Sequence, residues 1–121
     1  MKSKWIEHKD KRVFYSDFSG SGVEAQALRE EGREVIATVT QEPLNSVLAL
    51  SDVAGSVGTP ENLAVMRSIV SKTTPHIRKR AVVGVSAAQR ALLEIVNRIT
   101  GEKKFSAFAT AEQALDWLVA E

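Results

Sequence analysis

The sequence predicts an α/β fold built on a single, mostly parallel sheet. Short apolar runs rich in β-branched residues alternate with longer stretches whose apolar positions step by three and four, as in strands alternating with helices. A hydroxyl residue suited to capping precedes each helical stretch. Right-handed crossovers make such alternating strands parallel neighbours. We therefore expect the element order β-β-α-β-α-β-α-β-α.

The first two strands are expected to form a hairpin. "KWIEH" (residues 4–8) and "RVFYSDF" (residues 12–18) are rich in aromatic and β-branched residues, and the charged residues between them suit a turn. The first strand is therefore expected at the sheet edge, antiparallel to its neighbour. Ser21 and Glu24 have capping-box spacing and begin a predicted helix. Its buried stripe is expected to be Ala25, Leu28, Gly32, Val35 and Val39.

The most buried strands are expected at Val47–Leu50 and Val82–Val85. They lie in the continuous apolar runs "SVLALSDV" (residues 46–53) and "RAVVGV" (residues 80–85), which are typical of parallel strands covered by helices on both faces. Thr59, Pro60 and Glu61 begin the helix between them. A hydroxyl caps the first N–H groups, proline is tolerated in the first turn, and glutamate meets the positive end of the helix dipole.

Two further helices are expected after these strands. Ser86 and Gln89 form a capping box before the first, and Thr110 and Gln113 form one before the last. Between them, "KFSAFA" (residues 104–109) alternates between apolar and polar residues like a strand. The predicted sheet therefore has five strands.

Composition limits the classes of function. A chain of 121 residues with 44% hydrophobic residues suits one domain, residues 1–121. A net charge of +1 gives no support for nucleic-acid binding. The absence of cysteine excludes disulfides and thiolate chemistry. No export signal or apolar run of membrane-spanning length is present, so we expect a cytoplasmic protein without a membrane span.

The loop after the central strand, "AGSVGTPEN", is the first candidate site. Loops that follow parallel strands meet at the carboxyl edge of the sheet, where open α/β folds bind ligands. The loop lacks the lysine of a phosphate-binding P-loop. It either turns the chain and caps a helix, or also contacts a partner or an anion. The candidate contact or phospho-acceptor residues are Asp52, Ser56, Gly58 and Thr59, with Asp17, Ser19 and Ser86 as companions.

Asp17 and Asp52 follow strands that a crossover helix would place side by side. Two nearby carboxylates share a proton, bind a divalent cation, or accept hydrogen bonds from loop N–H groups. No third ligand stands at a recognisable spacing, so no metal or cofactor is expected. His8 and His76 are expected away from any serine–aspartate pair, so no hydrolytic triad is predicted. We therefore expect that the protein is not an enzyme.

Most lysine and arginine residues are expected at the opposite edge of the sheet. Bases at helix ends complement the helix dipoles, which is one interpretation of this distribution. The other is a landing patch for an anionic partner, without the aromatic residues that stack on nucleic acid. The candidate patch consists of Lys72, His76, Arg78, Lys79 and Arg80.

Three stretches carry a resemblance to a known family: "SVLALSDVAGS", "RAVVGVSAAQRALLEIVNRITG" and "FATAEQALDWL". Together with the element order, they resemble small STAS-like proteins related to the anti-sigma-factor antagonists. In that family a serine or threonine begins the helix after the central strand, and its phosphorylation blocks docking to a kinase-like partner. The corresponding position here falls within residues 56–59. The family's Asp-Ser-x-Gly or Asp-Thr-x-Gly signature is absent.

The resemblance implies a docking or regulatory module that acts through protein contact, with an unidentified protein partner. The same fold occurs in CRAL-TRIO lipid-transfer domains, so the alternative function is binding of a small apolar or anionic ligand. A chain of this length has little volume for a lipid cavity once its own core is filled. Homodimerisation through the edge strand or a helix face is a further open alternative.

Overall fold

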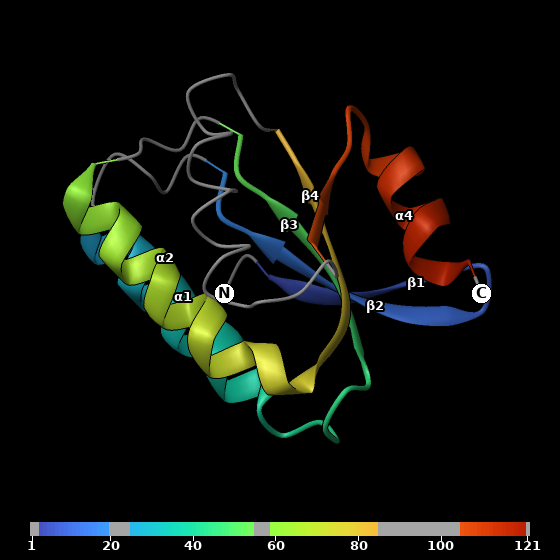
Figure 1. Ribbon diagram of the computed structural model, residues 1–121, viewed down its shortest axis with the longest axis horizontal. Coiled ribbons are helices and arrows are strands. Elements are labelled where there is room, and N and C mark those ends of the chain that lie inside the picture. The colour runs from blue at the N-terminus through green and yellow to red at the C-terminus, as the bar shows by residue number, and fades with distance from the viewer. Residues whose placement is uncertain (1–2, 20–24, 55–58, 85–104, 121) are drawn as a thin grey trace.

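The computed structural model describes residues 3–19, 25–54, 59–84 and 105–120 and shows an α/β protein with one mixed sheet (Figure 1). The strands lie in the order β1-β2-β3-β4-β5. Only β1 is antiparallel to its neighbour, and the others are parallel, as predicted. The strands are β1 (Lys4–His8), β2 (Lys11–Asp17), β3 (Val47–Asp52), β4 (Ile77–Val83) and β5 (Phe105–Ala107). The helices are α1 (Ala25–Val39), α2 (Pro60–Thr73), the short 3-10 helix η1 (Thr74–His76) and α4 (Ala111–Val119).

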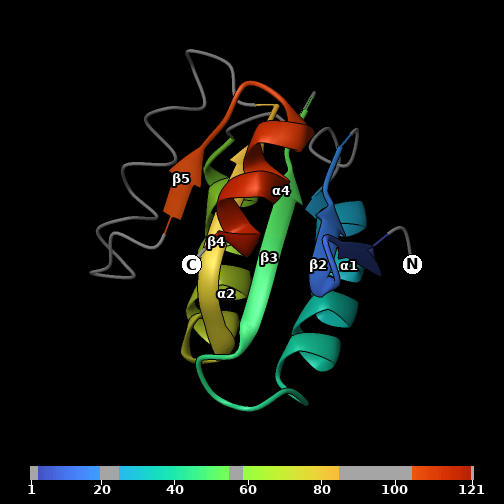
Figure 2. The ribbon, with the colours of Figure 1, turned by 90° about the vertical axis from the view of Figure 1, so that its right-hand side faces the viewer.

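The described helices cover both faces of the sheet. The crossovers from β2 to β3 and from β3 to β4 step in the same direction, so a right-handed connection places α1 and α2 on one face. Helix α4 follows the last strand and lies across the opposite face (Figure 2). None of the helices in the described part of the chain is long and apolar enough to cross a membrane.

The larger core lies between the sheet and the pair α1 and α2. Alternate residues of the strands, Phe14, Val47 and Val82 among them, pack there against Val35 and Ile69 of the two helices. The helices touch closely at Gly32, because a Cβ atom at that position would lie 2.4 Å from the Cδ1 atom of Ile69. Glycine is therefore the residue that lets α1 and α2 approach.

The second core lies under α4. Val13, Leu50 and Ala81 point to this face and pack against Ala114 and Leu118. These strand residues alternate with those of the first core, as the period of two in a pleated strand requires. Residues Val47 to Leu50 are all buried, as the continuous apolar run predicts.

Helix starts follow the predicted caps where the structure describes them. The Thr59 hydroxyl accepts a hydrogen bond from the Asn62 N–H at 3.1 Å, and the Thr110 hydroxyl accepts one from the Gln113 N–H at 3.2 Å. The predicted capping boxes at residues 21–24 and 86–89, and the helix expected after Ser86, lie outside the described residues.

One strand begins earlier than predicted. The sequence suggested a start at Arg80, but β4 begins at Ile77, because Ile77 is buried in the first core and pairs with Val47 of β3. The short helix η1, which contains Pro75, leads the chain directly into the strand. Two basic residues that were not predicted in the strand, Arg78 and Lys79, therefore belong to β4.

Replacing Leu48 with alanine is expected to lower the free energy of unfolding by about 2 to 5 kcal/mol, the range for a buried leucine. Leu48 is 8% exposed in the core under α4, whereas Leu44 is 70% exposed. Leu44→Ala is thus the matched control and is expected to change stability little. Urea denaturation measures both. Equal stability of the two variants would contradict the two-sided burial of β3.

Candidate functional site

Two aspartates lie side by side at the carboxyl edge of the sheet. Asp17 ends β2 and Asp52 ends β3, and the two residues are register partners in the parallel ladder. The Phe18 N–H then donates to the Asp52 carbonyl at 2.9 Å, so the pairing continues past the ends of the strands. The prediction that the two strands are neighbours and end with both aspartates at one edge is confirmed.

The Asp17 carboxylate is held by the loop that follows it. Its Oδ1 atom accepts a hydrogen bond from the Ser19 N–H at 3.0 Å and another from the Ser19 hydroxyl. The Asp17 N–H donates to the Ser3 hydroxyl at 2.9 Å, and the Ser3 N–H donates to Glu31 Oε2 at 3.0 Å. Ser3 and Glu31 are both buried, so this end of β2 is tied to α1.

The Asp52 carboxylate accepts two hydrogen bonds from different directions. The Tyr15 hydroxyl donates to Oδ2 at 2.8 Å, and the Ala54 N–H donates to Oδ1 at 3.0 Å. Burial of the ring raises the pKa of Tyr15 to about 12, with further contributions from the Asp52 hydrogen bond, the Asp52 charge and the Asp17 charge. Tyr15 therefore stays protonated and donates to Asp52 throughout the neutral pH range.

These contacts show one of the roles considered for the two carboxylates, that of accepting hydrogen bonds from loop N–H groups. Asp17 and Asp52 each accept a hydrogen bond from an N–H two residues further along the chain, as in an Asx turn. Within the described ranges, no group of three or more histidines, aspartates or glutamates is placed to hold a metal ion. Asp17 and Asp52 therefore hold the backbone that directly follows β2 and β3.

Thr59 lies at the same edge, where α2 begins. Its hydroxyl is engaged as the N-cap, and the following Glu61 makes an ion pair with Arg29 of α1 at 2.6 Å. The other predicted residues of this loop edge, Ser56, Gly58 and Ser86, lie outside the described residues.

The predicted basic patch is not brought together. Lys72 is exposed in the last turn of α2, and the His76 Nδ1 atom hydrogen-bonds the Glu42 carbonyl at 2.7 Å. Arg78 is exposed beside a register irregularity between β3 and β4. Lys79 and Arg80 point to opposite faces of the sheet, because neighbouring residues of a strand alternate.

Arg80 is a buried cation on the α2 side of the sheet. Its guanidinium donates to the Thr73 hydroxyl at 2.7 Å, and the residue is 7% exposed. Burial lowers the pKa of Arg80 to about 10, because a low-dielectric surrounding disfavours the charged form. Arg80 is therefore part of the interior and contributes nothing to a surface for anions.

Lys79 caps the C-terminal end of α4 on the other face of the sheet. Its ammonium group donates to the carbonyls of Trp117 at 3.0 Å and Ala120 at 2.7 Å, and it lies 5.0 Å from the centre of the Trp117 ring. Lys11 similarly donates to the Val119 carbonyl at 3.0 Å. These lysines neutralise the negative end of the helix, as the dipole interpretation predicts.

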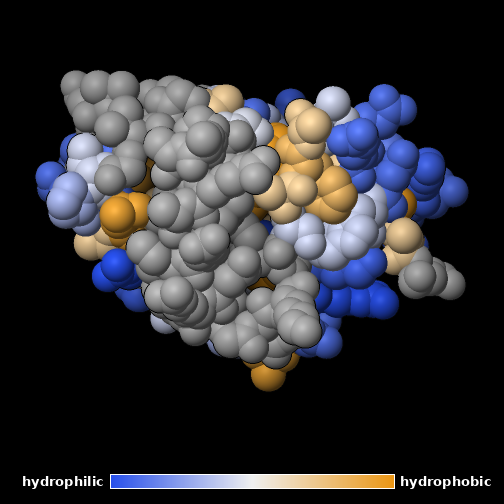
Figure 3. All heavy atoms as spheres, turned by 45° about the horizontal axis from the view of Figure 1, so that its top comes forward, coloured by the Kyte–Doolittle hydropathy of each residue, from blue (hydrophilic) through white to orange (hydrophobic). Residues whose placement is uncertain are grey.

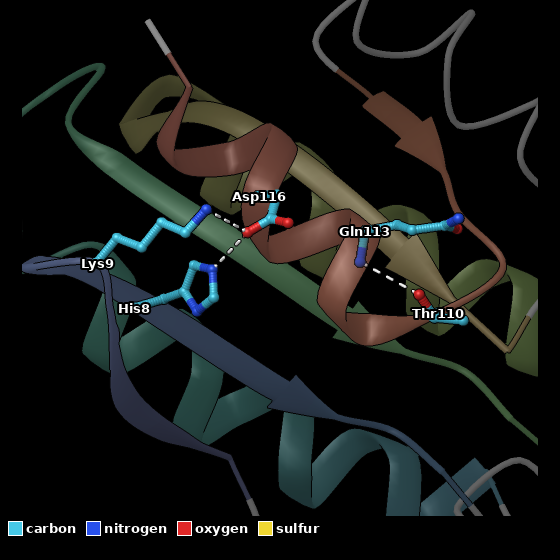
Figure 4. Close-up of polar contacts among 5 residues, drawn as sticks. All are labelled: His8, Lys9, Thr110, Gln113 and Asp116. Carbon is cyan, nitrogen blue, oxygen red and sulfur yellow. Dashed lines mark hydrogen bonds and ion pairs between the residues drawn. The ribbon is translucent and has the colours of Figure 1, made fainter.

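A histidine–aspartate contact at the hairpin was missed by the sequence interpretation. His8 and Lys9 both point to Asp116 of α4 (Figure 4), with His8 Nε2 at 2.8 Å and Lys9 Nζ at 3.0 Å from Oδ1. The His8 hydrogen bond, followed by that of Lys9, lowers the pKa of Asp116. The prediction concerned a serine–aspartate pair, so it did not anticipate this contact of His8 with an aspartate alone.

This contact belongs to a hydrophilic end of the molecule. Hydrophilic residues gather where the β1–β2 hairpin lies, on the right of Figure 3. His8 and Asp116 are 108 residues apart in the sequence, so no local spacing signals their contact. The contact contains no serine, and it joins α4 to the hairpin.

The chain matches no protein-family model and no curated protein.

The pKa of Tyr15 can be measured directly, because it is the only tyrosine in the chain. Tyrosinate absorbance is expected to rise with a midpoint near pH 12, above the ordinary 10.0. Since the pKa is raised in the folded state, the associated stability is complete below pH 10 and is lost as pH rises toward 12. Circular dichroism in parallel checks that the fold persists.

Asp52→Asn is expected to lower the midpoint of Tyr15 while leaving it above the ordinary value, because burial is the largest cause of the shift. Asp10→Asn removes the same charge at the hairpin and is expected to leave the midpoint unchanged. A midpoint that is the same in Asp52→Asn as in the wild type would show that the Tyr15–Asp52 hydrogen bond does not form.

Lys79→Met is expected to destabilise the fold by about 1 kcal/mol, since it removes hydrogen bonds to the end of α4. Arg78→Met removes the same charge from the exposed neighbouring residue and serves as the control. Thermal unfolding compares the two. The assignment of Lys79 to helix capping is wrong if Arg78→Met destabilises the protein as much.

Proposed function

We propose that this chain is a docking module that acts by protein contact rather than by catalysis, and that its partner binds the carboxyl edge of the sheet. The observation that carries the proposal is the adjacent pair Asp17 and Asp52, whose carboxylates are held by hydrogen bonds from Ser19, Tyr15 and Ala54. A surface whose charges are already oriented loses little conformational freedom when a partner binds.

The charge of this edge indicates the chemistry of the partner. Two fixed carboxylates favour a protein surface that carries lysine or arginine side chains, and charge complementarity governs the rate and specificity of association. Oδ1 of Asp17 and both oxygens of Asp52 accept these hydrogen bonds, which orient the two carboxylates for recognition. The STAS-like resemblance points to the same edge, because its switch position corresponds to residues 56–59.

Within this proposal, Thr59 acts in its unmodified state as the cap of α2. A phosphate on Ser56 or Thr59 would meet the helix N-terminus favourably but would be repelled by Asp52. The Glu61 carboxylate repels such a phosphate less, because Arg29 pairs with it. Phosphorylation would thus change the charge of the surface that the partner contacts at this edge.

A carbodiimide cross-linking experiment tests the proposal, because this reagent joins a carboxylate directly to a lysine amine. The tagged chain is treated in an extract of its host, and cross-linked peptides are identified by mass spectrometry. We expect a partner lysine joined to Asp17 or Asp52. The double variant Asp17→Asn with Asp52→Asn is expected to lose this partner, whereas Asp10→Asn retains it.

Two results would overturn the proposal. One is a set of captured proteins that is the same for the wild type and the double variant, including an empty set. The other is a reaction catalysed by the purified protein and abolished by Asp52→Asn. Circular dichroism of each variant separates loss of binding from loss of fold.

A further inference from the structure

A groove runs between α1 and α2 on the side of the helices away from the sheet. Its volume is about 430 Å³, within the range of ligand-binding sites. Ile36 of α1 and Val65 and Ile69 of α2 form its apolar part, and Gly32 keeps the two helices close beneath it. Ile36 and Val65 are only partly buried, so apolar surface remains open to solvent.

The rim of the groove is basic. Arg29 and Arg33 lie one turn apart on α1, and Lys72 lies near the end of α2. The single acidic residue that lines the groove, Glu61, is paired with Arg29. Arg33 and Lys72 are both exposed, and no ion pair among the described residues engages either of them. An occupant of this groove therefore meets an apolar floor flanked by positive charge.

The geometry favours a helix over an extended segment. The groove is bounded by helix surfaces, whose backbone N–H and C=O groups are already used within each helix, so an extended chain would find no backbone partners there. A helix satisfies its own backbone and packs its ridges between those of α1 and α2. Helices α1 and α2 run in the same direction, since both return from parallel strands (Figure 1).

We propose that the groove between α1 and α2 binds an acidic amphipathic helix of a partner protein. The apolar face of that helix lies on Ile36, Val65 and Ile69, and its acidic residues face Arg33 and Lys72. The groove extends from Glu61 to Lys72, which corresponds to about 16 Å or three helical turns. This site is separate from the carboxyl edge, so it stands or falls independently of the docking function proposed above.

The test uses a synthetic helix of about sixteen residues with leucines along one face and glutamates flanking them. Binding is measured by fluorescence anisotropy, and amide shifts in NMR spectra locate the contact. We expect shifts along α1 and α2 and a Kd that rises at least tenfold in the double variant Arg33→Glu with Lys72→Glu. Arg67→Glu, an exposed charge reversal on α2 outside the groove, is expected to change the Kd less than twofold.

A second variant separates the apolar floor from the basic rim. Ala64 lines the groove and is exposed, so Ala64→Glu places a bulky negative side chain in the binding site without disturbing the core. It is expected to abolish peptide binding while circular dichroism remains unchanged. A peptide with lysine in place of glutamate is expected not to bind.

Four results would overturn the proposal. The first is that the lysine peptide binds as well as the glutamate peptide, and the second is that the amide shifts fall outside α1 and α2. The third is that decanoate binds in place of the peptide, which would make the groove a site for small anionic amphiphiles. The fourth is that sedimentation shows a dimer that the Ala64→Glu substitution dissociates, which would make a second copy of this chain the occupant.

Discussion

Burial of the central strand on both faces is the constraint from which the rest of the structure follows. Val47 and Ala49 face the helices α1 and α2, while Leu48 and Leu50 face α4. An apolar strand of this kind is stable only when both faces are removed from water. The crossover helices cover one face, so the last helix must cover the other. Helix α4 has nine residues, and its apolar contacts are supplemented by polar ones.

Those polar contacts account for the role of several basic side chains of the hairpin and β4. Lys11 and Lys79 bind carbonyls at the end of α4, and His8 and Lys9 hold Asp116 on its surface. Each contact satisfies a group that the end of a helix leaves without an intrahelical partner, or pairs a charge across two elements. Four basic residues of the hairpin and β4 therefore attach one helix, α4, to the sheet.

Features that depend on neighbouring residues could be predicted from the sequence, whereas contacts between distant side chains could not. The caps at Thr59 and Thr110 involve residues three positions apart, so their sequence spacing predicts them. The alignment of Asp17 with Asp52 followed from topology, because parallel strands end at one edge. The early start of β4 was missed because the basic residues after Ile77 make the local sequence polar, whereas the burial of Ile77 depends on tertiary packing. The contact of His8 with Asp116 has no local signal at all.

The two proposed binding surfaces have opposite charge, which the net charge of the chain conceals. The carboxyl edge presents fixed carboxylates, whereas the groove between α1 and α2 presents Arg33 and Lys72. The total of +1 sums all 16 basic and 15 acidic residues of the chain, so it predicts neither surface. Helix α2 connects them: Thr59 caps it at the carboxyl edge, and Lys72 ends it at the far end of the groove. Helix α2 thus adjoins two surfaces of opposite charge on the same chain, and added salt would weaken the association of a charged partner with either surface.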